Sequence, residues 1–191
     1  DPSGLRLELI GADDARIPWQ QGTIEEAYAI RGIHSVTLLQ KSAGPTRQLM
    51  ENHLNFQYVG EEGNRVRLAA AAGGGAGKYV DLLIEPERDR GRNGVGTVHH
   101  VALEIESEDI HKELRAFLVS HDFRVTDIKD RKYFRSIYFR EPGGVLFEVA
   151  TSAPGFDVDE PLETLGRALK LPVDVEAERK EIEKVLPEVE Y

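Results

Sequence analysis

The chain of 191 residues carries 34 acidic and 24 basic residues, a formal net charge of −10, and no cysteine. Polyphosphates meet a mostly repulsive field on such a chain, which argues against nucleic acid as a partner. Disulfides and thiolate metal sites are excluded, and no apolar run approaches the ~20 residues of a membrane span. The length suits one or two domains, and the lack of cysteine favours the reducing cytoplasm.

Two pairs of segments show that the sequence is repetitive. Residues 1–8 (DPSGLRLE) resemble residues 141–148 (EPGGVLFE), and residues 32–38 (GIHSVTL) resemble residues 97–103 (TVHHVAL), 65 positions later (97 − 32). A fixed period indicates tandem copies of one folding unit. We therefore expect two complete units, preceded at residues 1–10 by the end of a truncated unit whose beginning is absent from the chain.

The first part of the chain predicts a connector and one βαβββ unit. Residues 5–10 have the pattern of a strand, and residues 11–30, which contain prolines and glycines, that of a connector. The unit at 31–95 is expected to comprise a strand, a helix and three strands, at 33–40, 46–54, 56–60, 65–70 and 79–85. We interpret the glycine-rich run 69–77 as a hairpin connection, because no Lys-Ser or Lys-Thr pair follows it as in a phosphate-binding loop.

The second part of the chain repeats this pattern. The unit at 96–153 is expected to have the same order of elements, at 98–105, 107–121, 124–130, 133–140 and 145–151. Beyond it, the tail at 154–191 contains two predicted helical stretches, 160–169 and 174–185, each ended by a proline. The pattern as a whole predicts an α+β fold of tandem βαβββ units with a helical C-terminal tail.

Polar side chains gather on one face of the second predicted sheet. Because side chains alternate along a strand, His100 is expected on the face opposite to His99, whose neighbours are apolar. The same alternation places Glu148 and Tyr138 on the polar face. Imidazole and carboxylate without sulfur suit divalent Fe, Mn or Zn, so this face predicts a metal site with His100 and Glu148 as ligands.

The other histidines do not complete this ligand set. The repeat aligns Ser35 with His100 and His34 with His99, so the unit at 31–95 is expected to contribute no metal ligand. The three remaining histidines fall on predicted helices or their ends, where surface or capping roles are expected: His53, His111 and His121. The third ligand is therefore expected in N-terminal sequence that the chain lacks.

Three motifs carry a resemblance to a known family. Residues 96–102 (GTVHHVA), 130–144 (DRKYFRSIYFREPGG) and 154–161 (PGFDVDEP) resemble the hydroquinone-type ring-cleaving dioxygenases of the vicinal-oxygen-chelate superfamily, which includes glyoxalase I, extradiol dioxygenases and antibiotic-resistance proteins. The resemblance runs along essentially the whole chain. It implies cupped mixed sheets, four units in the complete protein, and that this chain is the end of the second unit followed by the third and fourth.

The resemblance also implies roles for individual residues. His100 and Glu148 would be Fe(II) ligands, with Mn(II) as the alternative metal, and Arg131, Tyr138 and His99 would line the pocket of a hydroquinone- or catechol-like ring that is opened with O₂. The remaining histidine ligand would lie on the first unit. The chain alone is then expected to be inactive, and to need the missing N-terminal half or a homo-oligomeric partner.

Two alternatives share the same fold. A glyoxalase-like isomerase would hold a redox-silent metal and usually needs a fourth protein ligand. A non-catalytic member would bind a small molecule in the cupped sheet without metal. Because Ser35 replaces a ligand in one unit, loss of the metal elsewhere stays open.

Overall fold

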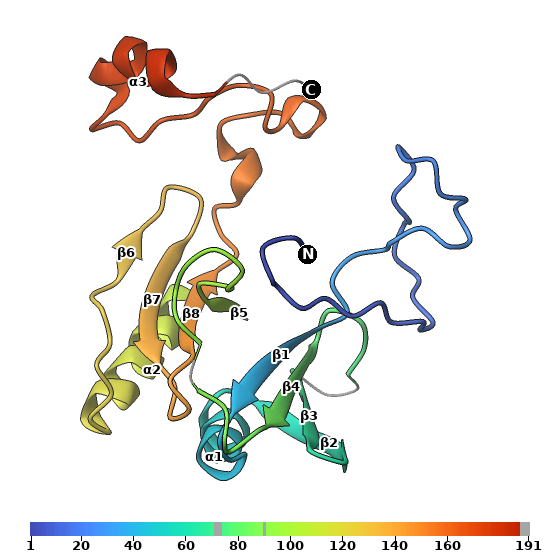
Figure 1. Cartoon of the computed structure of the whole chain (residues 1–191). Helices are drawn as coiled ribbons and strands as arrows, with labels where there is room; N and C mark the ends of the chain where they lie inside the picture. The colour runs from blue at the N-terminus through green and yellow to red at the C-terminus, as the bar shows by residue number, and fades with distance from the viewer. Residues whose placement is uncertain (71–73, 90, 188–191) are drawn as a thin grey trace.

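The computed structural model describes residues 1–70, 74–89 and 91–187. The first unit contains β1 (Ser35–Gln40), α1 (Gly44–His53), β2 (Phe56–Glu62), β3 (Arg65–Ala70) and β4 (Tyr79–Ile84). Its strands form one sheet in the order β1-β4-β3-β2 (Figure 1). The β1–β4 pair is parallel and the other two pairs are antiparallel, so the sheet is mixed.

The second unit has the same topology. It contains β5 (Val101–Ile105), α2 (Glu108–Ser120), β6 (Lys129–Asp130), β7 (Arg135–Arg140) and β8 (Leu146–Thr151), and its sheet has the order β5-β8-β7-β6. The predicted α+β fold of tandem βαβββ units is thereby confirmed. The start of α2 also follows the sequence, because Ser107 caps the helix by accepting a hydrogen bond from the backbone N–H of Ile110.

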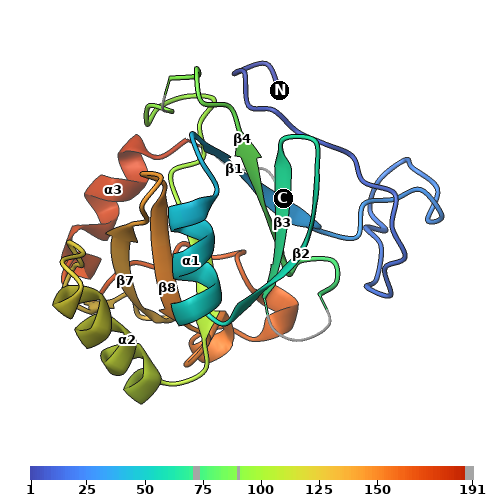
Figure 2. The ribbon, with the colours of Figure 1, turned by 90° about the horizontal axis from the view of Figure 1, so that it is seen from below.

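One face of each sheet is apolar and belongs to a common core. Alternate residues of the strands are buried, for example Leu68 and Leu82 in the first sheet and Ile137 and Phe147 in the second. The helices cover these faces: Figure 1 shows α2 behind β7 and β8, and Figure 2 shows α1 in front of β8. The opposite face of each sheet carries the polar side chains that form the candidate site.

A buried carboxylate joins the two units. Glu141, which is 2% exposed, accepts hydrogen bonds from Gln40 Nε2 (3.1 Å) and Thr46 Oγ1 (2.5 Å) of the first unit. The backbone N–H groups of Gly143 and Val145 donate to the same carboxylate. Four donors to one carboxylate offset its burial and fix the β7–β8 turn against α1.

The structure corrects several predicted elements. Residues 5–10 form no strand, because no described strand pairs with them and a strand needs a ladder partner. Only Lys129–Asp130 of the predicted strand 124–130 forms a strand, although the Thr126 backbone N–H also donates to the Tyr138 carbonyl of β7. Strand β5 begins at Val101 rather than at residue 98. The predicted hairpin connection at 69–77 includes residues 71–73, which lie outside the described residues.

The tail is less helical than predicted. The stretch 160–169 contains only the 3₁₀ turn η2 (Leu162–Thr164), because Gly166 has a φ of +82° and interrupts the helical conformation. The stretch 174–185 becomes η3 (Glu176–Glu178) followed by α3 (Arg179–Val185), after a further turn, η1 (Phe156–Val158). Figure 1 shows this tail rising away from both sheets. No helix among the described residues has the length and apolar character needed to cross a membrane.

Candidate metal centre

His100 and Glu148 lie in direct contact on the polar face of the second sheet. The His100 Nε2 atom is 2.8 Å from Glu148 Oε2. The Glu148 side chain is only 5% exposed, whereas that of His100 is 33% exposed, so the pair is open on the imidazole side. The predicted partners of a metal site are thus brought together.

Strand register explains why these side chains meet. On β8, Glu148 lies opposite Ala102 of the parallel strand β5 and opposite Tyr138 of the antiparallel strand β7. Residues directly opposite one another in a sheet project on the same side, so Tyr138 and Glu148 share a face. His100 precedes the first residue of β5 and reaches the same carboxylate from the strand entrance.

Tyr138 and Arg131 complete the surroundings of the carboxylate. The Tyr138 hydroxyl donates a hydrogen bond to Glu148 Oε1 at 2.5 Å, so the two carboxylate oxygens contact different groups. The His100 and Tyr138 rings meet edge to face, 5.8 Å apart between centroids. Arg131 lies in the β6–β7 turn with its guanidinium carbon 5.7 Å from the centre of the Tyr138 ring.

His99 lies beside His100, and the prediction that it points to the apolar face is wrong. Its Nδ1 atom is 2.8 Å from His100 Nδ1, and its side chain is exposed. Strict alternation fails because both histidines precede the first paired residue of β5, Val101. The position beside a bound ring that the family resemblance implies for His99 stays a prediction.

The donor set fits two positions of a divalent metal ion. Imidazole nitrogen and carboxylate oxygen bind such ions at ~2.0–2.2 Å, which puts two adjacent ligands ~3 Å apart. The 2.8 Å separation of His100 Nε2 and Glu148 Oε2 is close to that spacing. No group of three histidine or acidic side chains suited to a metal occurs within residues 1–70, 74–89 and 91–187. The described residues therefore offer two candidate ligands, His100 and Glu148, and no third beside them.

The remaining histidines lie elsewhere. His34 contacts Ser35 and the Tyr79 ring on the first sheet. His53 stacks on Phe117, and His121 follows the end of α2. His111 contradicts the predicted surface or capping role, because it is 1% exposed and lies within α2. Burial lowers its pKa, an effect that the Val149 backbone and Glu108 partly offset.

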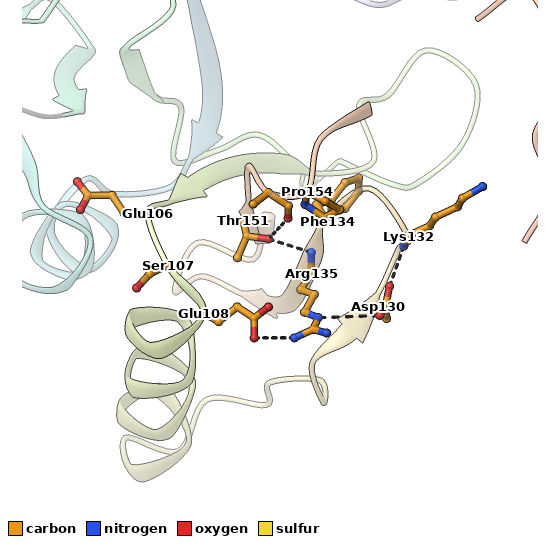
Figure 3. A pocket seen from close by; sticks show the side chains of 10 residues that line it. Glu106, Ser107, Glu108, Asp130, Lys132, Phe134, Arg135, Thr151 and Pro154 are labelled. Atoms are coloured by element: carbon orange, nitrogen blue, oxygen red, sulfur yellow. Dashed lines mark hydrogen bonds and ion pairs between the residues drawn. The ribbon is translucent and has the colours of Figure 1, made fainter. Parts of the chain in front are cut away.

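A separate pocket of about 310 Å³ lies at the other end of the second sheet (Figure 3). Arg135 extends into it from β7 and pairs with Glu108 at 2.6 Å, while its backbone N–H donates to Thr151. His100 and Glu148 do not line this pocket. Arg135 also lies 3.9 Å from Asp130, whereas Lys132 pairs with Asp159 outside the lining, and we assign the pocket no chemistry.

Sequence comparison places this chain in a known family. Residues 32–149 match the Glyoxalase/Bleomycin resistance protein/Dioxygenase superfamily. This match covers most of the chain, and the chain belongs to that superfamily, as the motifs around His99 and Tyr138 indicate.

The most similar relatives carry the names of ring-cleaving enzymes. The chain is 40% identical over 187 residues to MhqO of Bacillus subtilis, which is named as a proposed ring-cleaving dioxygenase; the match covers 97% of this chain and 59% of MhqO. It is 35% identical over 186 residues to the chlorohydroquinone/hydroquinone 1,2-dioxygenase of Sphingobium indicum, covering 94% of this chain and 57% of that enzyme. The chain thus spans about three-fifths of the length of these relatives.

A solved structure extends this likeness to three dimensions. The crystal structure of a proposed dioxygenase from Bacillus subtilis superposes with a TM-score of 0.82 at 40% sequence identity. The superposition covers 92% of this chain and 56% of that protein. The α+β fold of paired βαβββ units is therefore that of the superfamily.

Proposed function

We propose that this chain forms the metal-holding C-terminal part of a dioxygenase that opens a hydroquinone- or catechol-like ring with O₂ at a mononuclear Fe(II), with Mn(II) as the alternative. The observation that carries this proposal is the 2.8 Å contact between His100 Nε2 and Glu148 Oε2 on the polar face of the sheet. Relatives at 35 to 40% identity that are named for ring cleavage support the choice of reaction.

In this proposal His99 and Tyr138 orient the two metal ligands. A metal-binding histidine commonly donates its other ring N–H to a neighbour, and His99 Nδ1 lies 2.8 Å from His100 Nδ1 for that purpose. The Tyr138 hydroxyl donates to Glu148 Oε1, which leaves Oε2 for the metal. Both contacts hold the ligand atoms in place before the metal arrives.

Fe(II) at this site would act as a Lewis acid toward a phenolic oxygen and provide a position for O₂. Arg131, beside the Tyr138 ring, would hold an anionic ring oxygen by charge-assisted hydrogen bonds. Tyr138 would hold or release a proton at its hydroxyl as charge develops on the substrate. The deeply buried Glu148 and the half-open His100 leave the approach to the site on the imidazole side.

We infer that the third ligand comes from outside this chain. The relatives are longer than the chain, and large apolar side chains of residues 1–33 are exposed, including Leu9 (91%), Ile17 (81%) and Tyr28 (79%). Large exposed apolar side chains concentrated in one segment suit contact with further protein. In this proposal further sequence N-terminal to the chain, or a second copy, covers them and supplies a histidine.

Oxygen uptake with hydroquinone and Fe(II) tests the proposal. We expect the chain alone to show at most a trace of activity, and a protein lengthened N-terminally to the size of the relatives to be active. In that protein Glu148→Gln is expected to abolish both iron retention and oxygen uptake, because the amide keeps the shape and loses the charge. Glu104→Gln, an exposed change on the same sheet, is the matched control and should leave both unchanged.

The outcomes also separate the two alternatives. A lengthened protein that takes up a metal but consumes no oxygen with any dihydroxybenzene would support the isomerase. One that binds aromatic compounds and no metal would support the binding module. Full activity of the 191-residue chain alone would contradict the inference of an external ligand.

A further inference from the structure

The first sheet presents a carboxylate in the position that Glu148 occupies in the second. Asp81 of β4 lies opposite Thr37 of β1, just as Glu148 of β8 lies opposite Ala102 of β5. Thr37 and Ala102 are 65 positions apart (102 − 37), which is the spacing of the sequence repeat. Asp81 is therefore the structural counterpart of Glu148.

Two guanidinium groups surround this second carboxylate. Arg67 of β3 lies opposite Asp81, at the register position where Tyr138 lies opposite Glu148. Its Nε and Nη2 atoms each donate to Asp81 at 2.8 Å, and Arg65 Nη1 donates to Asp81 Oδ2 at 3.1 Å. The Asp81 side chain is fully buried, so these positive charges face a carboxylate that water does not reach.

Arg65 also binds a third carboxylate, Glu8. Its Nη1 and Nη2 atoms donate to the two oxygens of Glu8 at 3.0 and 2.6 Å. Glu8 ends the segment that resembles residues 141–148, and it aligns there with Glu148. Two carboxylates that correspond to the ligand Glu148, one from each of two repeats, are thus bridged by one guanidinium.

We propose that the polar face of the first sheet is a converted metal site, in which Arg65, supported by Arg67, takes the place of the divalent cation between Asp81 and Glu8. Through its contact with Glu8, Arg65 also fastens residues 1–10 to this sheet. The aligned position of the ligand His100 is Ser35, so the imidazole is missing as well. This inference rests on the metal site proposed above at His100 and Glu148, together with the repeat and the contacts of the two arginines, but it does not depend on which reaction that site performs.

The chemistry of guanidinium suits this replacement. Arginine is always positive and presents several N–H donors in a planar fork, which matches two carboxylates without an ion. Arg65 and Arg67 together balance the charges of Asp81 and Glu8. Burial would raise the pKa of Asp81, but the hydrogen bonds from Arg67 and Arg65 hold it below its ordinary value. The carboxylate therefore stays charged as a metal ligand would.

Returning the site to its inferred ancestral chemistry tests the proposal. Arg65→Gln with Arg67→Gln removes both charges and leaves amide oxygens, which are suitable ligands for hard cations. The change is made in the 191-residue chain carrying Glu148→Gln, so that the second sheet contributes no metal. Bound Mn²⁺ is counted by electron paramagnetic resonance, and folding is followed by circular dichroism.

We expect the glutamine pair to bind one additional Mn²⁺ per chain and to gain thermal stability as Mn²⁺ is added. The matched control, Arg65→Lys with Arg67→Lys, keeps the charges and is expected to bind none. Adding Asp81→Asn to the glutamine pair should remove the new binding. The proposal is overturned if the glutamine pair binds no more Mn²⁺ than the lysine pair, if Asp81→Asn leaves the binding intact, or if the glutamine pair stays unfolded at every Mn²⁺ concentration.

Discussion

The polar faces of the two sheets share the same strand register but carry different side chains around their buried carboxylates. On the second sheet a buried glutamate contacts an imidazole and a phenol, and no arginine or lysine among the described residues neutralises it. On the first sheet a buried aspartate contacts two guanidinium groups, which neutralise it from within. In our proposal one backbone framework thus supports both a metal site and a closed ionic joint, and the side chains opposite the carboxylate distinguish them.

The largest expected difference between the two sheets is in how strongly the stability of the chain depends on the buried carboxylate of each. Asp81→Asn leaves Arg65 and Arg67 facing a neutral amide in a buried position, and should cost roughly 3 kcal/mol in the free energy of unfolding. The groups that contact Glu148, the His100 imidazole and the Tyr138 hydroxyl, carry no permanent charge. Glu148→Gln should therefore lower the free energy of unfolding by about 1 kcal/mol. Urea denaturation of both variants measures the difference.

A surface change provides the baseline for that comparison. Glu51 pairs with Arg47 on the exposed side of α1, and Glu51→Gln should change stability by less than about 0.5 kcal/mol. Equal costs for Asp81→Asn and Glu148→Gln would contradict the distinction between a closed and an open site.

The joint between the units is the next most sensitive feature. A Cβ atom at Gly143 would overlap the side chain of Gln40, so Gly143→Ala should cost about 1–3 kcal/mol. Combining it with Gln40→Ala removes the overlap, and the double variant should be more stable than the sum of the single effects predicts. Strictly additive costs in thermal or urea unfolding would show that the two residues do not meet.

Much of the fold follows from the sequence where strands find partners. The repeat of 65 residues and the apolar alternation predict both sheets and both helices, and the structure confirms them. Residues 5–10 carry the same pattern but have no ladder partner among the described residues, so pattern alone gives a false strand there. Gly166 interrupts a tail helix that composition favours.

The candidate site shows a similar limit. Alternation predicts that His100, Glu148 and Tyr138 share one face, and their contacts match this, whereas His99 lies before the strand begins and does not follow the rule. The sequence repeat does not reveal Asp81, because it lies 67 positions from Glu148 (148 − 81) rather than 65. The connections within the units differ in length, so only strand register reveals the correspondence.

The buried His111 of α2 is expected to make the stability of the second unit depend on pH. Its pKa is lowered by burial, so the folded chain binds its proton less readily than the unfolded chain does. Its contribution to stability is therefore present above pH ~6.5 and declines as the pH falls below that value. His111→Phe should make the loss of stability between pH 7 and 5 smaller, as measured by thermal unfolding. An unchanged slope would exclude His111 as its source.

The smallest expected effect concerns the attachment of residues 1–10 to the first sheet. Glu8 is largely exposed, so a double-mutant cycle with Glu8→Gln and Arg65→Gln should give a coupling below about 1 kcal/mol. Because salt screens exposed pairs, the coupling should shrink at high ionic strength. A coupling that salt leaves unchanged would require a contact other than this ion pair.

The most direct test of the whole account is to locate metal in both sheets at once. Crystals of the lengthened protein grown with Fe(II) would be measured on both sides of the iron absorption edge. We predict one anomalous peak per chain, at ~2.0–2.3 Å from His100 Nε2 and a Glu148 oxygen, and no peak beside Asp81. A peak between Asp81 and Glu8, or an iron that contacts neither His100 nor Glu148, would contradict the account.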